Sequence, residues 1–128
     1  MIILDTHVWI WWMTESPKLS SPAAAAIAEY SIIGIPSISC WEIAMLVAKN
    51  RLTFSMDVQT WLKLSLEHPK IRLLPLSPEI AVLSTRLPKN FHSDPADRLI
   101  VATCLTYQTS LVSKDSLSQQ WGQLEVIW

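Results

Sequence analysis

Five short runs of branched apolar residues, separated by segments with helix-start signals, constrain the fold of this chain most strongly. The runs cover residues 1–4, 32–38, 71–76, 109–113 and 124–127. Valine, isoleucine and leucine follow one another there without strict alternation, which is typical of parallel strands covered on both faces. We therefore predict an α/β fold, a three-layer α/β/α sandwich around a mostly parallel sheet of about five strands.

The segments between these runs carry start and stop signals of helices. Ser21-Pro22, Ser77-Pro78 and Asp94-Pro95 each combine a capping side chain with a proline that suits the first helical turn. Helices are predicted through 8–12, over 21–30, from 39 to about 50, over 57–67, from 77 to before Pro88, and from 94 to about 107. Gly34 and Gly122 are the two glycines, which excludes a glycine-rich phosphate loop of the Rossmann or P-loop kind.

Length and composition indicate one well-packed domain over residues 1–128. Half of the residues are hydrophobic and 16% are charged, so we expect a generous core and no extended disorder. The formal net charge of −1 excludes a broadly basic nucleic-acid surface but allows a local basic patch. Cys40 and Cys104 match no zinc or CxxC pattern, and no signal peptide opens the chain. We therefore expect reduced thiols in a cytoplasmic protein.

The stretch between Glu29 and Lys49 is about as long as a membrane span, and Glu42 is its only charged residue. A membrane-spanning helix is therefore one interpretation of this stretch. Gly34 and Pro36 interrupt it, however, and a charge inside the bilayer costs a few kcal/mol. A buried strand followed by a packed helix is the better interpretation. We therefore expect no membrane association.

Four acidic residues lie in or directly beside apolar runs: Asp5, Glu42, Asp97 and Asp115. A carboxylate seldom adjoins a core unless it is paired, hydrogen-bonded or bound to a metal. The functional crevice of an open α/β sheet lies beyond the carboxyl ends of its strands, so the predicted fold can gather these side chains. Carboxylate oxygens suit Mg²⁺ or Mn²⁺, and such a site supports phosphodiester hydrolysis. The three histidines lack zinc spacing such as HExxH.

Helix capping is the alternative interpretation of the same acids. Ser39 to Glu42 matches a capping box, in which Glu42 accepts a hydrogen bond from the backbone N–H of Ser39. Acids at helix N-termini are also favoured by the helix dipole. That reasoning applies to the remaining candidates, which are Asp5, Asp94, Asp97 and Asp115.

Four segments together resemble the motifs of PIN-domain ribonucleases, and most closely those of VapC-type toxins from toxin–antitoxin pairs. They are ILDTHVW at 3–9, SCWEIA at 39–44, DPADRLIVA at 94–102 and LVSKD at 111–115. The resemblance covers nearly the whole chain in the family's order and spacing. It implies a PIN-like α/β/α domain and endonucleolytic cleavage of RNA. It also implies inhibition by a cognate antitoxin.

The resemblance implies that Mg²⁺ or Mn²⁺ is held by the quartet Asp5, Glu42, Asp97 and Asp115, with Ser113 as a supporting hydroxyl. We expect Asp5 and Asp97 to be the main ligands, because each sits at the end of a rigid element. Glu42 and Asp115 complete the shell, and one of them orients the attacking water.

Other residues beside the quartet are candidates for supporting roles. Thr6, His7 and Asp94 are expected to support the ligands, although Asp94 is first of all a helix cap. Arg98 and Lys114 adjoin quartet members and are candidates for substrate phosphates, with solvated surface charges as the alternative.

Two other classes of function stay open. A PIN-like module that binds RNA or protein without useful turnover differs from a nuclease only in its activity. A phosphatase-like or receiver-like domain fits poorly, because Asp5 is followed by Thr6-His7 instead of forming a DxD pair, and residues 75–77 supply no phosphoacceptor acid.

The chain contains seven tryptophans, which is more than the motifs require. Trp41 and Trp61 lie at helical positions where core packing is expected. Trp9, Trp11 and Trp12 cannot share one helix face, because neighbouring side chains diverge by about 100°. We therefore expect at least one to meet solvent or a partner, which is an antitoxin, a second copy of this chain in a homodimer, or an unpaired RNA base.

Overall fold

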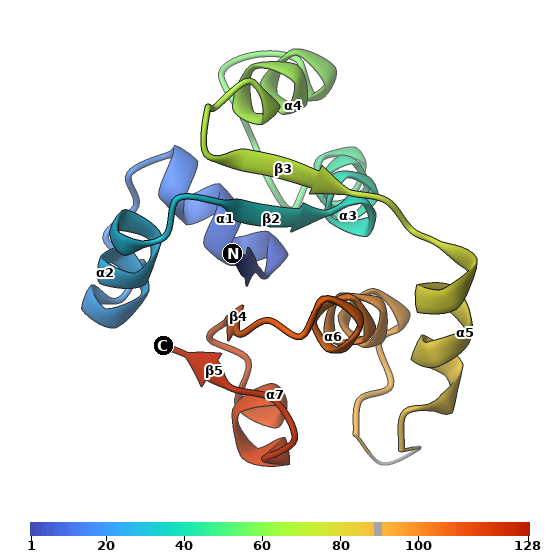
Figure 1. Cartoon of the computed structure of the whole chain (residues 1–128). Helices are drawn as coiled ribbons and strands as arrows, with labels where there is room; N and C mark the ends of the chain where they lie inside the picture. The colour runs from blue at the N-terminus through green and yellow to red at the C-terminus, as the bar shows by residue number, and fades with distance from the viewer. Residues whose placement is uncertain (89–90) are drawn as a thin grey trace.

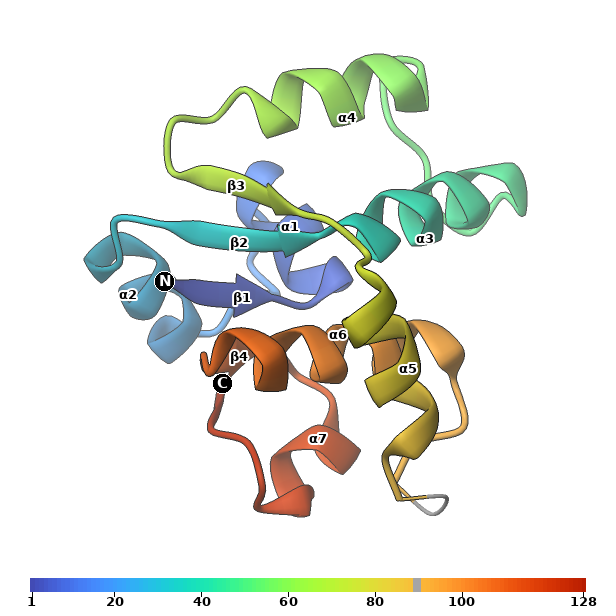
Figure 2. The same cartoon turned by 45° about the vertical axis from the view of Figure 1, so that its right-hand side comes forward.

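A single parallel sheet organises the computed structural model, which describes residues 1–88 and 91–128. Its strand order is β3-β2-β1-β4-β5, and every neighbouring pair is parallel (Figures 1 and 2). The strands are β1 (Ile2–Leu4), β2 (Ile33–Pro36), β3 (Ile71–Leu74), β4 (Leu111–Val112) and β5 (Val126–Ile127). The predicted α/β class and five-stranded parallel sheet are confirmed, although the strands are shorter than the apolar runs.

Seven helices occupy the described part of the chain between and beside these strands. They are α1 (Thr6–Met13), α2 (Ser21–Glu29), α3 (Ser37–Ala48), α4 (Val58–Leu66), α5 (Pro78–Arg86), α6 (Pro95–Tyr107) and α7 (Ser116–Trp121). Figure 1 shows α4 beside the β3 edge of the sheet and α7 beside the β5 edge. None of the helices in the described residues is long and apolar enough to cross a membrane.

Two apolar clusters, one on each face of the sheet, produce the three layers. Side chains alternate across a strand, so Ile2 and Leu4 join one cluster while Ile3 joins the other. The first cluster includes residues of α1, α2 and α4, among them the fully buried Trp9. The second packs the end of α5 and the buried stripe of α6, including Ile100. Both faces of the sheet are therefore covered, as the unbroken apolar runs predict.

Side-chain caps precede most of the helices. Ser77 and Asp94, as predicted, each accept a hydrogen bond from a first-turn backbone N–H of α5 and α6. Asp57 does the same for α4 at 3.0 Å. The cap of α2 is Ser20, one residue before the predicted Ser21. At the other end of α2, the Lys70 Nζ donates to the carbonyls of Ile27 and Ala28.

The predicted capping box at the start of α3 is wrong. The helix begins at Ser37 behind Pro36, which offers no side-chain cap, so Ser39 already lies inside the first turn. Ser39 is fully buried and its Oγ lies 2.9 Å from the Oγ1 of Thr6. Glu42 accepts a hydrogen bond from that same Thr6 hydroxyl. Ser39 and Glu42 therefore face Thr6 of α1 instead of their own backbone.

The tryptophans divide between core and surface. Trp9 is fully buried and its Nε1 donates to the Oγ of Ser65 at 2.7 Å. Trp61 is also buried, as predicted, and stacks on Phe54. The prediction of core packing is wrong for Trp41, which is 57% exposed, because its position on α3 faces away from both apolar clusters.

Candidate functional site

The four predicted acids converge at the carboxyl end of the sheet. Asp5 directly follows β1, and Asp115 lies three residues past the end of β4. Glu42 projects from α3, which follows β2 without a loop, and Asp97 lies in the first turn of α6. All four line one cavity of about 500 Å³, together with Asp94, His7, Val8, Trp11, Lys114 and Ser116.

Asp5 lines this cavity, and each of its carboxylate oxygens accepts a hydrogen bond. Its Oδ1 accepts from the backbone N–H of Thr6 at 2.7 Å, which caps α1. Its Oδ2 accepts from the Oγ of Ser113 at 2.7 Å. Burial raises the pKa of the Asp5 carboxyl, and the hydrogen bond from Ser113 opposes that rise. Ser113 therefore touches the predicted ligand directly, and Asp5 is both a helix cap and a wall of the cavity.

Glu42 is fixed by Thr6, a residue adjacent to Asp5. The fully buried Thr6 hydroxyl donates to the Oε1 of Glu42. Burial raises the pKa of the Glu42 carboxyl, and the negative charge of Asp5 raises it further. Thr6 thus connects two of the acids, through its backbone to Asp5 and through its hydroxyl to Glu42.

Asp97 is partly buried and lies among the negative charges of the other acids. Burial, followed by the charges of Asp5, Asp94, Glu42 and Asp115, raises its pKa to about 8. One carboxylate oxygen of Glu42, one of Asp94 and one of Asp97 lie within 4.8 Å of one another. Asp94 also caps α6 by accepting from the backbone N–H of Ala96 at 2.9 Å. Asp94 is thus a cap and a member of the acidic cluster.

Asp115 differs from the other three acids because its charge is well stabilised. Burial favours a higher pKa, but hydrogen bonds from the hydroxyl and backbone N–H of Ser118, with His92 nearby, outweigh it and lower the pKa. The bonds to Ser118 are 2.7 and 3.0 Å long and cap α7. The backbone N–H of Asp115 donates in turn to Ser113.

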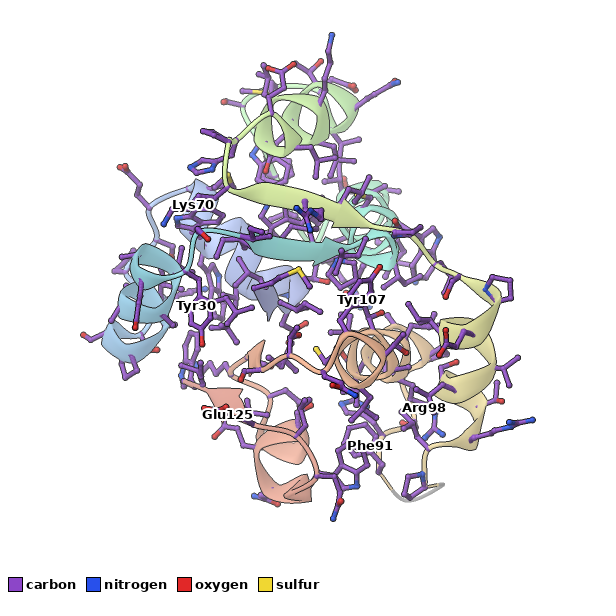
Figure 3. All side chains as sticks on the ribbon, in the orientation of Figure 1. Tyr30, Lys70, Phe91, Arg98, Tyr107 and Glu125 are labelled. Atoms are coloured by element: carbon purple, nitrogen blue, oxygen red, sulfur yellow. The ribbon has the colours of Figure 1, made fainter. Side chains whose placement is uncertain are left out.

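Arg98 is turned away from the acids. Its Nε donates to the carbonyl of Ser84, its Nη2 to that of Leu87, and its Nη1 to those of Pro88 and His92. Figure 3 shows the Arg98 side chain between α6 and α5. The guanidinium therefore joins the end of α5 to the segment before α6, and Arg98 does not line the cavity. Lys114, the other predicted phosphate contact, does line it.

Two residues near the acids were not singled out from the sequence: His92 was missed, and Trp11 was not distinguished from Trp9 and Trp12. His92 places its Nε2 3.1 Å from the Oδ2 of Asp97 and 3.5 Å from the Oδ2 of Asp115. Trp11 lines the cavity and packs between His7 and Trp128, at ring-centroid distances of 5.9 and 5.7 Å. The nearness of His92 to the DPADR segment is a sequence signal for the first. The crowding of tryptophans at 9–12 is a signal for the second.

The donor set fits a hard divalent cation. Three of the converging carboxyls have raised pKa values, first because burial disfavours their charged forms and then because neighbouring acids repel those charges. Their ligand atoms are all oxygens, which Mg²⁺ and Mn²⁺ prefer. A bound cation would offset the repulsion from the neighbouring acids, which adds to the effect of burial on the pKa of Asp97. The cavity is large enough to admit a substrate phosphate and several waters beside the carboxylates.

Comparisons with known proteins agree with this architecture. Ribonuclease VapC22 of Mycobacterium tuberculosis is 37% identical over 114 residues, which are 89% of this chain and 86% of that protein. The structure of VapBC2 from Rickettsia felis bound to a DNA fragment from its promoter matches with a TM-score of 0.72 at 19% identity, over 98% of this chain and 97% of that chain. The structure of FitAcB from Neisseria gonorrhoeae matches with a TM-score of 0.69 at 22% identity, over 98% and 96%.

The two structural matches show that the fold is shared, and the sequence matches show the family. The family model described as PIN domain matches residues 2–118, which include all four acidic segments. Together with the mycobacterial ribonuclease, this match confirms the resemblance found in the motifs. This chain belongs to the PIN domain family.

Proposed function

We propose that this chain forms one PIN-like domain over residues 1–128 and acts as a metal-dependent endoribonuclease, the toxin of a toxin–antitoxin pair. The observation that carries the proposal is the convergence of Asp5, Glu42, Asp97 and Asp115 around one cavity, with the pKa of Asp97 raised to about 8. The name of the mycobacterial relative supports RNA as the substrate. A structural neighbour described as a toxin–antitoxin complex from Klebsiella pneumoniae supports an antitoxin partner.

Asp5 and Asp97 would be the principal ligands of Mg²⁺ or Mn²⁺, with Glu42 and Asp115 completing the shell. When bound, the ion supplies a water of lowered pKa as nucleophile and neutralises charge on the scissile phosphate. Thr6 and Ser113 orient the ligands, since each donates a side-chain hydrogen bond to one carboxylate. Burial raises the pKa of the Glu42 carboxyl, which suits it to orient the attacking water and accept its proton.

The substrate would lie across the cavity from the acids toward Lys114 and Trp11. Lys114 offers a cation for a phosphate next to the scissile one. Trp11 offers a partly buried ring on which an unpaired base can stack, and His7 lines the cavity beside it. The resulting arrangement suits single-stranded RNA, because a base inside a duplex is not free to stack on a side chain.

Partners would supply the contacts that this near-neutral chain lacks. With a net charge of −1, its surface attracts RNA phosphates weakly, so we propose that a homodimer provides part of the RNA-binding surface. A cognate antitoxin would inhibit the enzyme. The exposed Trp41 on α3 is a suitable anchor for one of these protein contacts.

Incubation of purified full-length protein with total RNA tests the function. The reaction is run with Mg²⁺ or Mn²⁺ and with EDTA, and Asp97→Asn is run beside the wild type. Asp57→Asn is the matched control, because Asp57 is an exposed helix cap outside the site and asparagine also caps helices. We expect discrete metal-dependent cuts that disappear in Asp97→Asn and persist in Asp57→Asn. RNA binding without cleavage would favour the alternative, a PIN-like binding or regulatory module.

A further inference from the structure

His92 lies between two of the acids that define the cavity. Its Nε2 is 3.1 Å from the Oδ2 of Asp97 and 3.5 Å from the Oδ2 of Asp115, and 12% of its side chain is exposed. Asp97 belongs to α6 and Asp115 precedes α7. One imidazole therefore contacts carboxylates from two elements that approach the site from different parts of the chain.

The hydrogen bond at the other ring nitrogen defines which nitrogen carries the proton in the neutral ring. The backbone N–H of Asp94 donates to the Nδ1 of His92 at 3.3 Å, so Nδ1 acts as an acceptor. A neutral imidazole has one donor and one acceptor, and the donor must then be Nε2. The proton therefore sits on Nε2, the nitrogen that lies 3.1 Å from the Oδ2 of Asp97 and 3.5 Å from the Oδ2 of Asp115.

The backbone around His92 is held on both sides. The Nη1 of Arg98 donates to the carbonyl of His92 at 2.9 Å. The preceding residue, Phe91, is buried and packs against Trp121 at a ring-centroid distance of 4.5 Å. Figure 3 shows Phe91 and Arg98 on either side of this segment. The imidazole is thus anchored by its neighbours and not by the acids alone.

We propose that His92 is a positioning residue that holds Asp97 and Asp115 in the geometry that binds the divalent cation. The inference rests on the metal site in the proposed function. Two carboxylates facing each other repel, and a hydrogen-bond donor between their Oδ2 atoms fixes both groups, which leaves the other oxygen of each for the cation. Groups that orient metal-binding carboxylates in this way typically contribute about 10- to 100-fold to metal affinity.

Binding of Mn²⁺ to the full-length chain in the absence of RNA tests this role, by calorimetry or by the electron paramagnetic resonance signal of free Mn²⁺. His92→Gln and His92→Asn form a matched pair. The glutamine amide reaches about as far as Nε2 and donates toward Asp97, whereas the asparagine amide ends near the position of Nδ1. We expect His92→Asn to weaken Mn²⁺ binding about 10-fold or more and His92→Gln to stay within about 3-fold of wild type.

A second histidine provides the control. His68 also accepts a backbone N–H at its Nδ1, from Lys70 at 3.1 Å, but it lies against Trp12 outside the cavity. His68→Asn should leave Mn²⁺ affinity unchanged. Equal affinity in wild type, His92→Gln and His92→Asn would overturn the proposal. Equal loss in both His92 variants would overturn it as well, since it would indicate that the ring itself is a ligand.

The tautomer of the His92 ring can be measured in the wild type, so this test does not depend on how the variants fold. Two-bond nitrogen–proton correlations of the histidine ring report its tautomer, and we expect the Nε2–H form for His92 without metal. The Nδ1–H form would overturn the proposal. If Mn²⁺ binds as expected but RNA is not cut, the proposed nuclease function fails while the role of His92 stands.

Discussion

Ser113 and Asp5, 108 positions apart in the sequence, are joined by a 2.7 Å hydrogen bond from the serine Oγ to the Oδ2 of the aspartate. The bond links the ends of β4 and β1, which are neighbouring parallel strands. The same Oγ accepts the backbone N–H of Asp115 at 2.9 Å. The single buried hydroxyl of Ser113 therefore bonds two acids of the site, and its position depends on how β4 and β1 are paired.

Ser113→Ala should destabilise the fold and weaken catalysis together. Removing the hydroxyl leaves a buried carboxylate oxygen without its donor, which costs about 1–2 kcal/mol in free energy of unfolding. We expect the rate of RNA cleavage to fall about 10-fold, because Asp5 loses an orienting contact. Urea denaturation and single-turnover cleavage measure the two effects.

Ser110→Ala is the matched control for that substitution. Ser110 precedes the same strand at its other end and donates to the exposed side chain of Glu125 at 2.7 Å. Its loss should change neither cleavage nor stability by more than about 0.5 kcal/mol. Equal effects of the two substitutions would contradict a specific link between Ser113 and Asp5.

The stability of the metal-free protein should fall as pH rises from 5 to 8. The pKa of Asp97 is raised from 3.8 to about 8, first by burial and then by the neighbouring acids. Between those values the folded state holds a proton that the unfolded state has released, so raising the pH favours unfolding. The raised pKa values of Asp5 and Glu42 act in the same direction. The lowered pKa of Asp115 acts oppositely, and its stabilisation is lost only in acid.

Urea denaturation in EDTA at several pH values measures this slope. Asp97→Asn has no proton to lose there and should flatten the decline, whereas Asp57→Asn should retain it. A wild-type free energy of unfolding that rises between pH 5 and pH 8 would contradict the assignment.

Mn²⁺ should reverse the loss of stability at pH 8. A cation that binds only the folded state stabilises it by about 2.7 kcal/mol at 100 times its dissociation constant. The effect should be small at pH 5, where the raised pKa values keep protons on the ligands. Thermal melts with and without Mn²⁺ at both pH values measure it. An Asp97→Asn protein that Mn²⁺ stabilises as strongly as wild type would exclude Asp97 as a principal ligand.

Much of this architecture is predictable from sequence because it follows from local patterns and chain topology. Apolar runs locate all five strands, and the parallel order then brings Asp5 and Asp115 to one edge of the sheet. The contacts of Glu42 are harder to predict, because the pattern Ser-x-x-Glu is the same whether a helix begins at Ser39 or two residues earlier. Its actual partner, Thr6, lies 36 positions away, and no local pattern encodes that contact.

Arg98 and His92 show two other reasons why the sequence misleads. Arg98 adjoins Asp97, but successive side chains on a helix diverge by about 100°, so the neighbour of a ligand points to another surface. Here that surface is the end of α5. Zinc spacing is the only pattern tested for His92, and it does not describe a histidine that lies between carboxylates.

Trp11→Ala should raise the KM for single-stranded RNA while kcat changes less. Base stacking on an aromatic side chain contributes about 1–3 kcal/mol, which corresponds to a KM increase of roughly 5- to 150-fold. Trp11→Phe preserves a stacking surface and should recover most of the affinity. Trp41→Ala, outside the cavity, should leave the KM of the monomeric, antitoxin-free chain unchanged. A wild-type KM in Trp11→Ala would exclude the stacking role.

Lys114→Ala should affect substrate binding, whereas Arg98→Ala should affect the stability of the fold. Lys114 is exposed at the cavity, so its loss should raise the KM for RNA several-fold and reduce the salt dependence of binding, with little change in the free energy of unfolding. Arg98 donates to four backbone carbonyls, and its loss should destabilise the fold by about 2–4 kcal/mol.

Arg98→Lys sharpens the comparison, because lysine keeps the charge but cannot reproduce the planar set of donors that reaches all four carbonyls. If Arg98 stabilises the fold through those bonds, Arg98→Lys should be nearly as unstable as Arg98→Ala. Cleavage below the melting temperature should retain the wild-type KM in both Arg98 variants. A raised KM in Arg98→Ala with wild-type stability would instead place the guanidinium on the substrate and contradict the geometry.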